Sequence, residues 1–157
     1  MFSKETEDQF KHLLSLYPRK RSALIPMLLL AQKEDRYIKP KTIEYVARYL
    51  DLHPSEVDSI MSFYTLLRRH PVGKYHIMIC TNLSCLLRGS DDIEGCVKRK
   101  LGVDLGEVTA DGLFSAIEFE CLASCTTAPV VQINGEFYEN LDVSKTEQIL
   151  DELRSRG

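Results

Sequence analysis

The sequence contains no run of about 20 apolar residues, the length that a membrane-spanning helix requires. The longest apolar run near its start, Ala23 to Ala31, lies well inside the chain and is interrupted by Pro26, unlike a secretory signal. We therefore expect a cytoplasmic protein without direct membrane insertion. A Gly-rich phosphate loop, a dinucleotide fingerprint and a Ser/His/Asp arrangement are also missing, so the isolated chain is not expected to turn over a substrate.

The chain also has little net charge, with 20 Lys and Arg against 23 Asp and Glu. The formal net charge is −3, but residues 1–72 carry 12 Lys and Arg against 9 Asp and Glu, whereas residues 73–157 carry 8 against 14. Nucleic acid is recognised through clustered positive charge, which the second part of the chain does not offer. We therefore expect no nucleic-acid partner.

The composition, with 44% hydrophobic and 27% charged residues, is that of an ordinary globular protein. Its character changes near His70–Gly73, which predicts a helical domain over residues 1–72 and a second domain over residues 73–157. Apolar residues in the first part recur at helical intervals, and Pro40 and Pro54 suit helix starts. The four predicted stripes are Phe10/Leu13/Leu14/Tyr17, Leu24/Met27/Leu28/Ala31, Ile43/Val46/Ala47/Leu50 and Val57/Ile60/Met61.

The second part alternates between strand and helix signals. We predict strands over 75–80, 114–120, 129–133 and 136–139, and helices over 91–101 and from Ser144 onward. Ser90 is a candidate N-cap, Ser144 with Glu147 resembles a capping box, and Asn134-Gly135 indicates a hairpin. The strand–helix–strand unit is expected to be parallel. The fold class is therefore α+β, a helical bundle followed by a thioredoxin-like α/β domain.

Four of the five cysteines form two close pairs. Cys80 and Cys85 follow the spacing C-x4-C, and Cys121 and Cys125 follow C-x3-C, with 35 residues between the pairs. Each pair begins where a predicted strand ends, and in α/β sheets ligand sites collect at such ends. If the two strands are parallel, four thiolates converge on one site.

Four sulfur ligands indicate either zinc or an iron–sulfur cluster. A [2Fe–2S] cluster suits two separated pairs, one pair for each iron, while structural zinc more often supports small domains that lack another core. Spacing favours the cluster over zinc, and a reducing compartment disfavours disulfides. A thiol–disulfide oxidoreductase normally uses C-x-x-C, which neither pair has. Cys96 lies inside a predicted helix and is expected to be a packed residue.

The chain resembles the small thioredoxin-like [2Fe–2S] subunit of the NADH-oxidising module of respiratory complex I. Related subunits occur in NAD-linked hydrogenases and formate dehydrogenases. The matching segments are Ile60-Met-Ser-Phe-Tyr64, Gly73-Lys-Tyr75, Cys80-Thr-Asn-Leu-Ser-Cys85, Gly106-Glu-Val-Thr-Ala-Asp-Gly112, Glu120-Cys-Leu-Ala-Ser-Cys125 and Ala128-Pro129. One departure is Ala123, where the family often has glycine.

The resemblance implies one [2Fe–2S] cluster held by Cys80, Cys85, Cys121 and Cys125, with none of the ligand roles left to Cys96. It also implies a partner, an FMN- and NADH-binding flavoprotein iron–sulfur subunit, beside which this chain transfers electrons without turning over substrate. Through such a complex it would lie peripherally on the inner face of a membrane. An equivalent hydrogenase or formate dehydrogenase subunit, a free-standing ferredoxin and a zinc-stabilised adaptor remain as alternatives.

Overall fold

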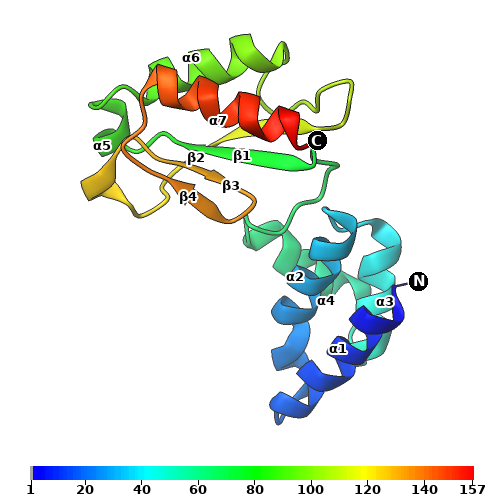
Figure 1. Cartoon of the computed structure of the whole chain (residues 1–157). Coiled ribbons are helices and arrows are strands. Elements are labelled where there is room, and N and C mark those ends of the chain that lie inside the picture. Colours follow the sequence, from blue (N-terminus) through cyan, green and yellow to red (C-terminus); the bar gives the residue numbers. More distant parts are fainter. Residues whose placement is uncertain (1) are drawn as a thin grey trace. The chain divides into compact units, whose positions relative to one another are not determined.

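The structure is a computed structural model that describes residues 2–157. The chain forms two compact units, one ending at Pro71 and the other spanning Val72–Gly157. Both units are drawn in Figure 1. The first contains only helices and the second combines helices with a sheet, so the predicted α+β class is confirmed.

The helical unit follows the apolar stripes of its sequence. Its elements are α1 (Lys4–Leu16), η1 (Lys20–Ala23), α2 (Leu24–Asp35), α3 (Pro40–Leu50) and α4 (Pro54–Phe63). Proline opens both α3 and α4, where its missing N–H has no intrahelical partner to lose. Phe10, fully buried on α1, packs edge-on against Tyr49 of α3, with ring centroids 5.9 Å apart. The unit thus has a core of its own.

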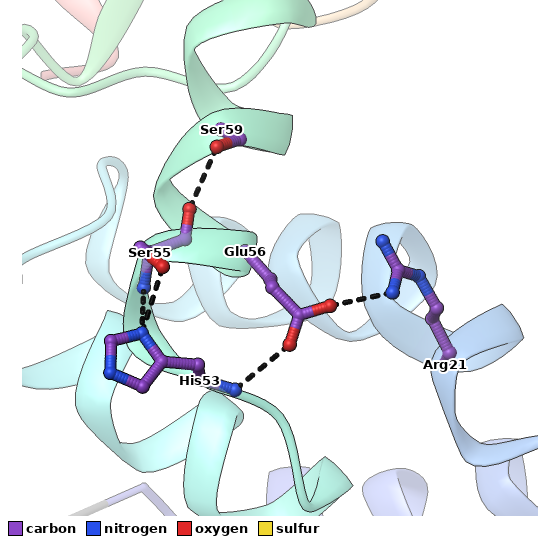
Figure 2. A network of polar contacts seen from close by, with 5 residues as sticks. All are labelled: Arg21, His53, Ser55, Glu56 and Ser59. Carbon is purple, nitrogen blue, oxygen red and sulfur yellow. Dashed lines mark hydrogen bonds and ion pairs between the residues drawn. The ribbon is translucent and has the colours of Figure 1, made fainter.

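Polar side chains cap the start of α4, as Figure 2 shows. The Glu56 carboxylate accepts the His53 backbone N–H at 3.1 Å, and His53 Nδ1 accepts the Ser55 backbone N–H at 3.3 Å. Arg21 Nη1 also contacts Glu56 at 2.5 Å. Because the carboxylate reaches the His53 backbone and not its ring, His53, Ser55 and Glu56 form a helix cap and not a nucleophilic triad.

Substituting His53 tests this cap. His53→Ala is expected to lower the free energy of unfolding of the helical unit by about 1 kcal/mol, because one orphan N–H loses its acceptor. His53→Asn should be at least as stable as the parent, since asparagine is a preferred N-cap. Urea unfolding followed by circular dichroism measures both variants. Equal stability of His53→Ala and the parent would rule out a capping role.

The second unit is built on a four-stranded sheet in the order β2-β1-β3-β4. Its elements are β1 (Tyr75–Cys80), α5 (Leu83–Leu86), α6 (Ser90–Leu101), β2 (Phe114–Phe119), η2 (Cys125–Thr127), β3 (Val131–Ile133), β4 (Glu136–Tyr138) and α7 (Val143–Ser155). Strands β1 and β2 are parallel, as predicted, and the other neighbours are antiparallel. The two parallel strands therefore end at the same edge of the sheet.

Helices α6 and α7 lie side by side over one face of this sheet (Figure 1). Their apolar sides bury Ile77 and Ile79 of β1 together with Phe114 of β2. In the turn between β3 and β4, Asn134 and Gly135 take positive φ angles of 52° and 98°, so the predicted hairpin is confirmed. This packing makes the sheet a rigid support for the loops at its edges.

Two predicted helix caps are wrong. Helix α6 begins at Ser90 itself, with Gly89 as its N-cap at φ 93°, and the buried Ser90 hydroxyl has no hydrogen-bond partner among the described residues. Helix α7 begins at Val143, because the Asp142 side chain accepts the Lys145 N–H at 2.7 Å in place of the expected Ser144 cap. Among residues 2–157, no helix is long and apolar enough to cross a membrane.

Candidate cluster-binding site

The two cysteine loops leave the sheet at one edge. Cys80 is the last residue of β1, and Cys121 follows two residues after Phe119, the last residue of β2. The parallel register pairs Cys80 with Phe119. The backbone N–H of Cys80 also donates to the Val130 carbonyl at 3.2 Å. Cys80 is therefore held between β2 on one side and the residue that precedes β3 on the other. Tertiary pairing thus brings the two loops to the same edge.

The first loop buries both of its cysteines. Cys80 and Cys85 each expose 2% of their surface, and Cys85 is placed by the short helix α5. The Cys85 N–H donates to the Asn82 carbonyl at 2.8 Å, which closes the turn. Around the two thiols lie apolar side chains, namely Phe119, Leu122, Ala128 and Val130. Both sulfurs therefore sit in a medium of low polarity.

The thiol of Cys85 titrates far from its ordinary range. Burial, followed by its interaction with Cys80, raises the pKa of Cys85 to about 11, and Cys125 adds to the rise through its charge. A backbone hydrogen bond from Val130 acts in the opposite direction. In the metal-free chain Cys85 is therefore a neutral thiol at pH 7, and a bound cation is required to hold it as the thiolate that ligates metal.

The second loop carries the exposed cysteines. Cys121 and Cys125 are both solvent-exposed, and η2 begins at Cys125. The Ala123 N–H donates to Cys121 Sγ at 3.3 Å. Backbone N–H groups that donate to sulfur are among the interactions that set the reduction potential of an iron–sulfur centre. This loop therefore presents two exposed sulfurs, one of which accepts a backbone hydrogen bond.

The donor set fits a two-iron cluster. Within residues 2–157, no three Cys, His, Asp or Glu side chains stand together in a way that would hold one metal ion. One zinc ion needs its four sulfurs around a single point, whereas a [2Fe–2S] cluster takes two cysteines on each of two irons. The chain offers a buried pair, Cys80 and Cys85, and an exposed pair, Cys121 and Cys125, and the chemistry of these four sulfurs is that of a [2Fe–2S] ligand set.

The fifth cysteine and the buried histidine lie elsewhere. Cys96 exposes 1% of its surface within α6, its Sγ lies 3.8 Å from the Val143 carbonyl oxygen, and burial raises its pKa. His76 on β1 is 3% exposed and its Nδ1 lies 2.9 Å from Ser115 Oγ. Both residues are packed within the second unit, as the sequence indicated for Cys96.

Ala123 adopts a left-handed backbone conformation with φ 58°. A side chain at this φ costs about 1–2 kcal/mol, which is the physical reason why glycine suits this position. Only the loop geometry reveals this cost. In the sequence alone, Ala123 is identified only as a departure from the pattern of the family that the chain resembles.

Replacing Ala123 by glycine is expected to stabilise the metal-free chain by about 0.5–1 kcal/mol, because the left-handed strain disappears while some chain entropy is lost. Denaturant unfolding of the metal-free protein measures this. Ala128→Gly is the matched control, since Ala128 is fully buried with an ordinary φ of −61°, and its change should destabilise. A loss of stability in both variants would contradict the assignment.

Sequence reasoning missed a set of polar contacts beside Cys125. The hydroxyls of Ser124 and Thr127, which flank this cysteine, both donate to the Glu139 carboxylate. These two hydrogen bonds lower the pKa of Glu139, so the carboxylate is ionised at neutral pH. The hydroxyl residues beside a candidate ligand were a visible signal. Their carboxylate partner, 12 residues beyond Thr127, was not.

Comparison with known proteins places these features in one family. The family model described as thioredoxin-like [2Fe-2S] ferredoxin matches residues 10–154. A protein of Rickettsia bellii (strain RML369-C), named as a subunit of NADH-quinone oxidoreductase, is 45% identical over 157 residues, 98% of this chain and 94% of that protein. A protein of the same name in Mycobacterium bovis (strain ATCC BAA-935 / AF2122/97) is 41% identical over 145 residues, 92% of this chain and 58% of that protein.

A solved structure shares the fold. A chain of the NAD+-reducing [NiFe]-hydrogenase in the H2-reduced state superposes with a TM-score of 0.75 and 19% identity, over 86% of this chain and 22% of that one. Likeness at that identity concerns the fold alone. The family match over residues 10–154 and the relatives of 41–45% identity carry the conclusion: this chain belongs to the thioredoxin-like [2Fe-2S] ferredoxin family.

Proposed function

We propose that this chain is an electron-transfer subunit of an NADH:quinone oxidoreductase and holds one [2Fe–2S] cluster through Cys80, Cys85, Cys121 and Cys125. The observation that carries the proposal is the meeting of the two cysteine loops at the edge where β1 and β2 end. Membership of the family and the names of the relatives support it. A bound [2Fe–2S] cluster supplies one-electron transfer.

The two cysteine pairs would play different roles in such a site. Cys80 and Cys85 are enclosed by apolar side chains, which keep water away from the inner pair of ligands. Cys121 and Cys125 lie at the surface, so the outer pair faces the side from which a redox partner approaches. Ala123 directs its N–H at Cys121 Sγ and stabilises negative charge on that sulfur.

Hydride chemistry belongs to a partner in this proposal. We infer that a flavoprotein iron–sulfur subunit binds FMN and NADH, while this chain only receives and returns electrons. The sequence contains no dinucleotide fingerprint, in agreement with this division of labour. The complex would be cytoplasmic and peripheral on the inner face of the membrane. An NAD-linked hydrogenase subunit is the second candidate, because the solved structure with the same fold belongs to such an enzyme.

The respiratory assignment is favoured over the hydrogenase because the relatives that carry the respiratory name are 41–45% identical, against 19% for the hydrogenase chain. Co-purification from the native host, followed by identification of the bound subunits, separates the two. A quinone-reducing assembly supports the proposal, and a hydrogenase assembly overturns its respiratory part.

The cluster itself is tested by anaerobic purification, iron and sulfide analysis, visible absorption and EPR spectroscopy. We expect two irons and two sulfides per chain, a reddish-brown colour, and a rhombic EPR signal only after reduction with dithionite. Protein that contains one zinc and stays EPR-silent after reconstitution with iron and sulfide would overturn the proposal and leave a zinc-stabilised adaptor. A cluster-loaded protein that never associates with a flavoprotein would instead be a free-standing ferredoxin.

A further inference from the structure

The second cysteine loop is tied to the end of β4 by three side chains. Thr127 Oγ1 lies 2.8 Å from Glu139 Oε1 and 2.8 Å from Ser124 Oγ, and Ser124 Oγ also donates to Glu139 Oε1. Ser124 directly precedes Cys125, and Thr127 closes the η2 turn that begins at Cys125. The carboxylate therefore holds the residues on both sides of this cysteine.

Hydrogen-bond capacity determines which of these contacts matter. Each hydroxyl has one proton, and the ionised Glu139 carboxylate has none. The Thr127 hydroxyl also lies 3.2 Å from the Ser124 carbonyl oxygen, but the charged Glu139 carboxylate is the stronger acceptor, because charge-assisted bonds are roughly twice as strong as neutral ones. Ser124 and Thr127 contact each other, and Glu139 is the charged acceptor that both hydroxyls share.

Backbone contacts continue the connection. The Asn140 N–H donates to the Thr127 carbonyl at 2.7 Å, and the Leu141 N–H donates to the Pro129 carbonyl at 3.2 Å. The segment that links β4 to α7 thus runs along the second cysteine loop. Glu139 occupies the point where this segment leaves the strand, so its side chain can reach a loop that is distant in sequence.

The strand register places Glu139 at the cysteine end of the sheet. Tyr138 pairs with Val131, and the residue before Val131 accepts the backbone hydrogen bond of Cys80. Glu136, at the other end of β4, pairs with Ile133, and Ile133 pairs with Ile77 near the start of β1. The same strand therefore carries one carboxylate near the cysteines and another at the opposite end.

We propose that Glu139 is a positioning residue for the iron–sulfur site, which holds the Cys121–Cys125 loop in shape through Ser124 and Thr127 and adds a fixed negative charge beside it. This inference rests on the proposed function. Partners of metal ligands typically change affinity or activity by about 10–100-fold when lost. Negative charge near an iron–sulfur centre lowers its reduction potential.

Three variants separate the positioning role from the charge. Glu139→Ala removes both, and the cluster is expected to be lost to an iron chelator about 10-fold faster than in the parent. Glu139→Gln keeps an acceptor of the same shape but removes the charge, so cluster retention should largely return. Thr127→Val removes one hydroxyl and keeps the charge, so retention should fall while the potential stays near that of the parent.

The midpoint potential is the readout that a merely structural role would not move. Loss of the charge in Glu139→Gln is expected to favour the reduced state by about threefold, or about 30 mV at 59 mV per tenfold for one electron. Glu136→Gln is the matched control, because it removes the same charge from the far end of the strand. EPR-monitored redox titration of the full chain measures both variants.

The outcomes distinguish this inference from the proposed function. If the parent binds a cluster and Glu139→Ala retains it as long as the parent does, the positioning role is refuted. If Glu139→Gln and Glu136→Gln shift the potential equally, the charge acts through the protein as a whole and not beside the loop. If the parent itself never takes up a cluster, the proposed function fails. In that case, backbone hydrogen exchange of residues 121–127 in the metal-free protein still tests whether Glu139 holds the loop. Faster exchange in Glu139→Ala than in the parent would support the positioning role.

Discussion

Replacing any one of Cys80, Cys85, Cys121 and Cys125 by alanine is expected to reduce cluster content by more than the roughly 10–100-fold that the loss of an outer partner costs. Each change removes one of the four proposed thiolate ligands and leaves no donor atom in its place. Cys96→Ala should keep full cluster content, because Cys96 is packed within α6. Iron and sulfide content and visible absorption after anaerobic reconstitution measure the effect.

The position of each cysteine provides the internal control for folding. Cys121 and Cys125 are exposed, so the stability of their alanine variants should lie within about 0.5 kcal/mol of the metal-free parent. Cys80 and Cys85 are buried, so their alanine variants carry an additional folding cost. Loss of the cluster from the folded Cys121 or Cys125 variants therefore reports ligation alone. Full cluster content in any of the four single variants would contradict the assigned ligand set.

Gly73→Ala is expected to destabilise the second unit by about 3 kcal/mol or more, the upper range for overpacked positions. A Cβ at Gly73 would lie 2.3 Å from the carbonyl carbon of Phe114, 2.7 Å from its Cα and 2.7 Å from its oxygen. These are backbone atoms of a paired strand, and they cannot rotate away as a side chain can. Gly73 also donates its N–H to the buried Ser115 Oγ at 3.0 Å, so moving the backbone breaks a hydrogen bond.

Denaturant unfolding of the metal-free chain measures this effect, and Gly95→Ala is its control. Gly95 lies within α6, where a Cβ would meet only Arg99 Nη1, at 3.2 Å, the end of a flexible side chain. Alanine there should stabilise by about 0.5–1 kcal/mol through its higher helix propensity. If Gly73→Ala proves as stable as the parent, the close approach of the two backbone segments does not exist.

Much of the fold was predictable because its signals are local. The helical stripes, the prolines at Pro40 and Pro54 and the Asn134-Gly135 turn each act within a few residues. The N-caps of helices were harder to predict, since several neighbouring residues can occupy the capping position within one turn. Asp142 took the place expected for Ser144, and Gly89 took the place expected for Ser90. Small differences in local geometry decide such competitions.

The order of the main helices and strands and the positions of the cysteines after two strands follow from local sequence signals, because periodicity and spacing are properties of neighbouring residues. The burial of Cys80 and Cys85 and the exposure of Cys121 and Cys125 follow instead from how the chain packs in three dimensions. The same packing brings the Glu139 side chain to the second cysteine loop. These features depend on contacts between segments distant in the chain, which form only when β1, β2 and β4 take their places in one sheet.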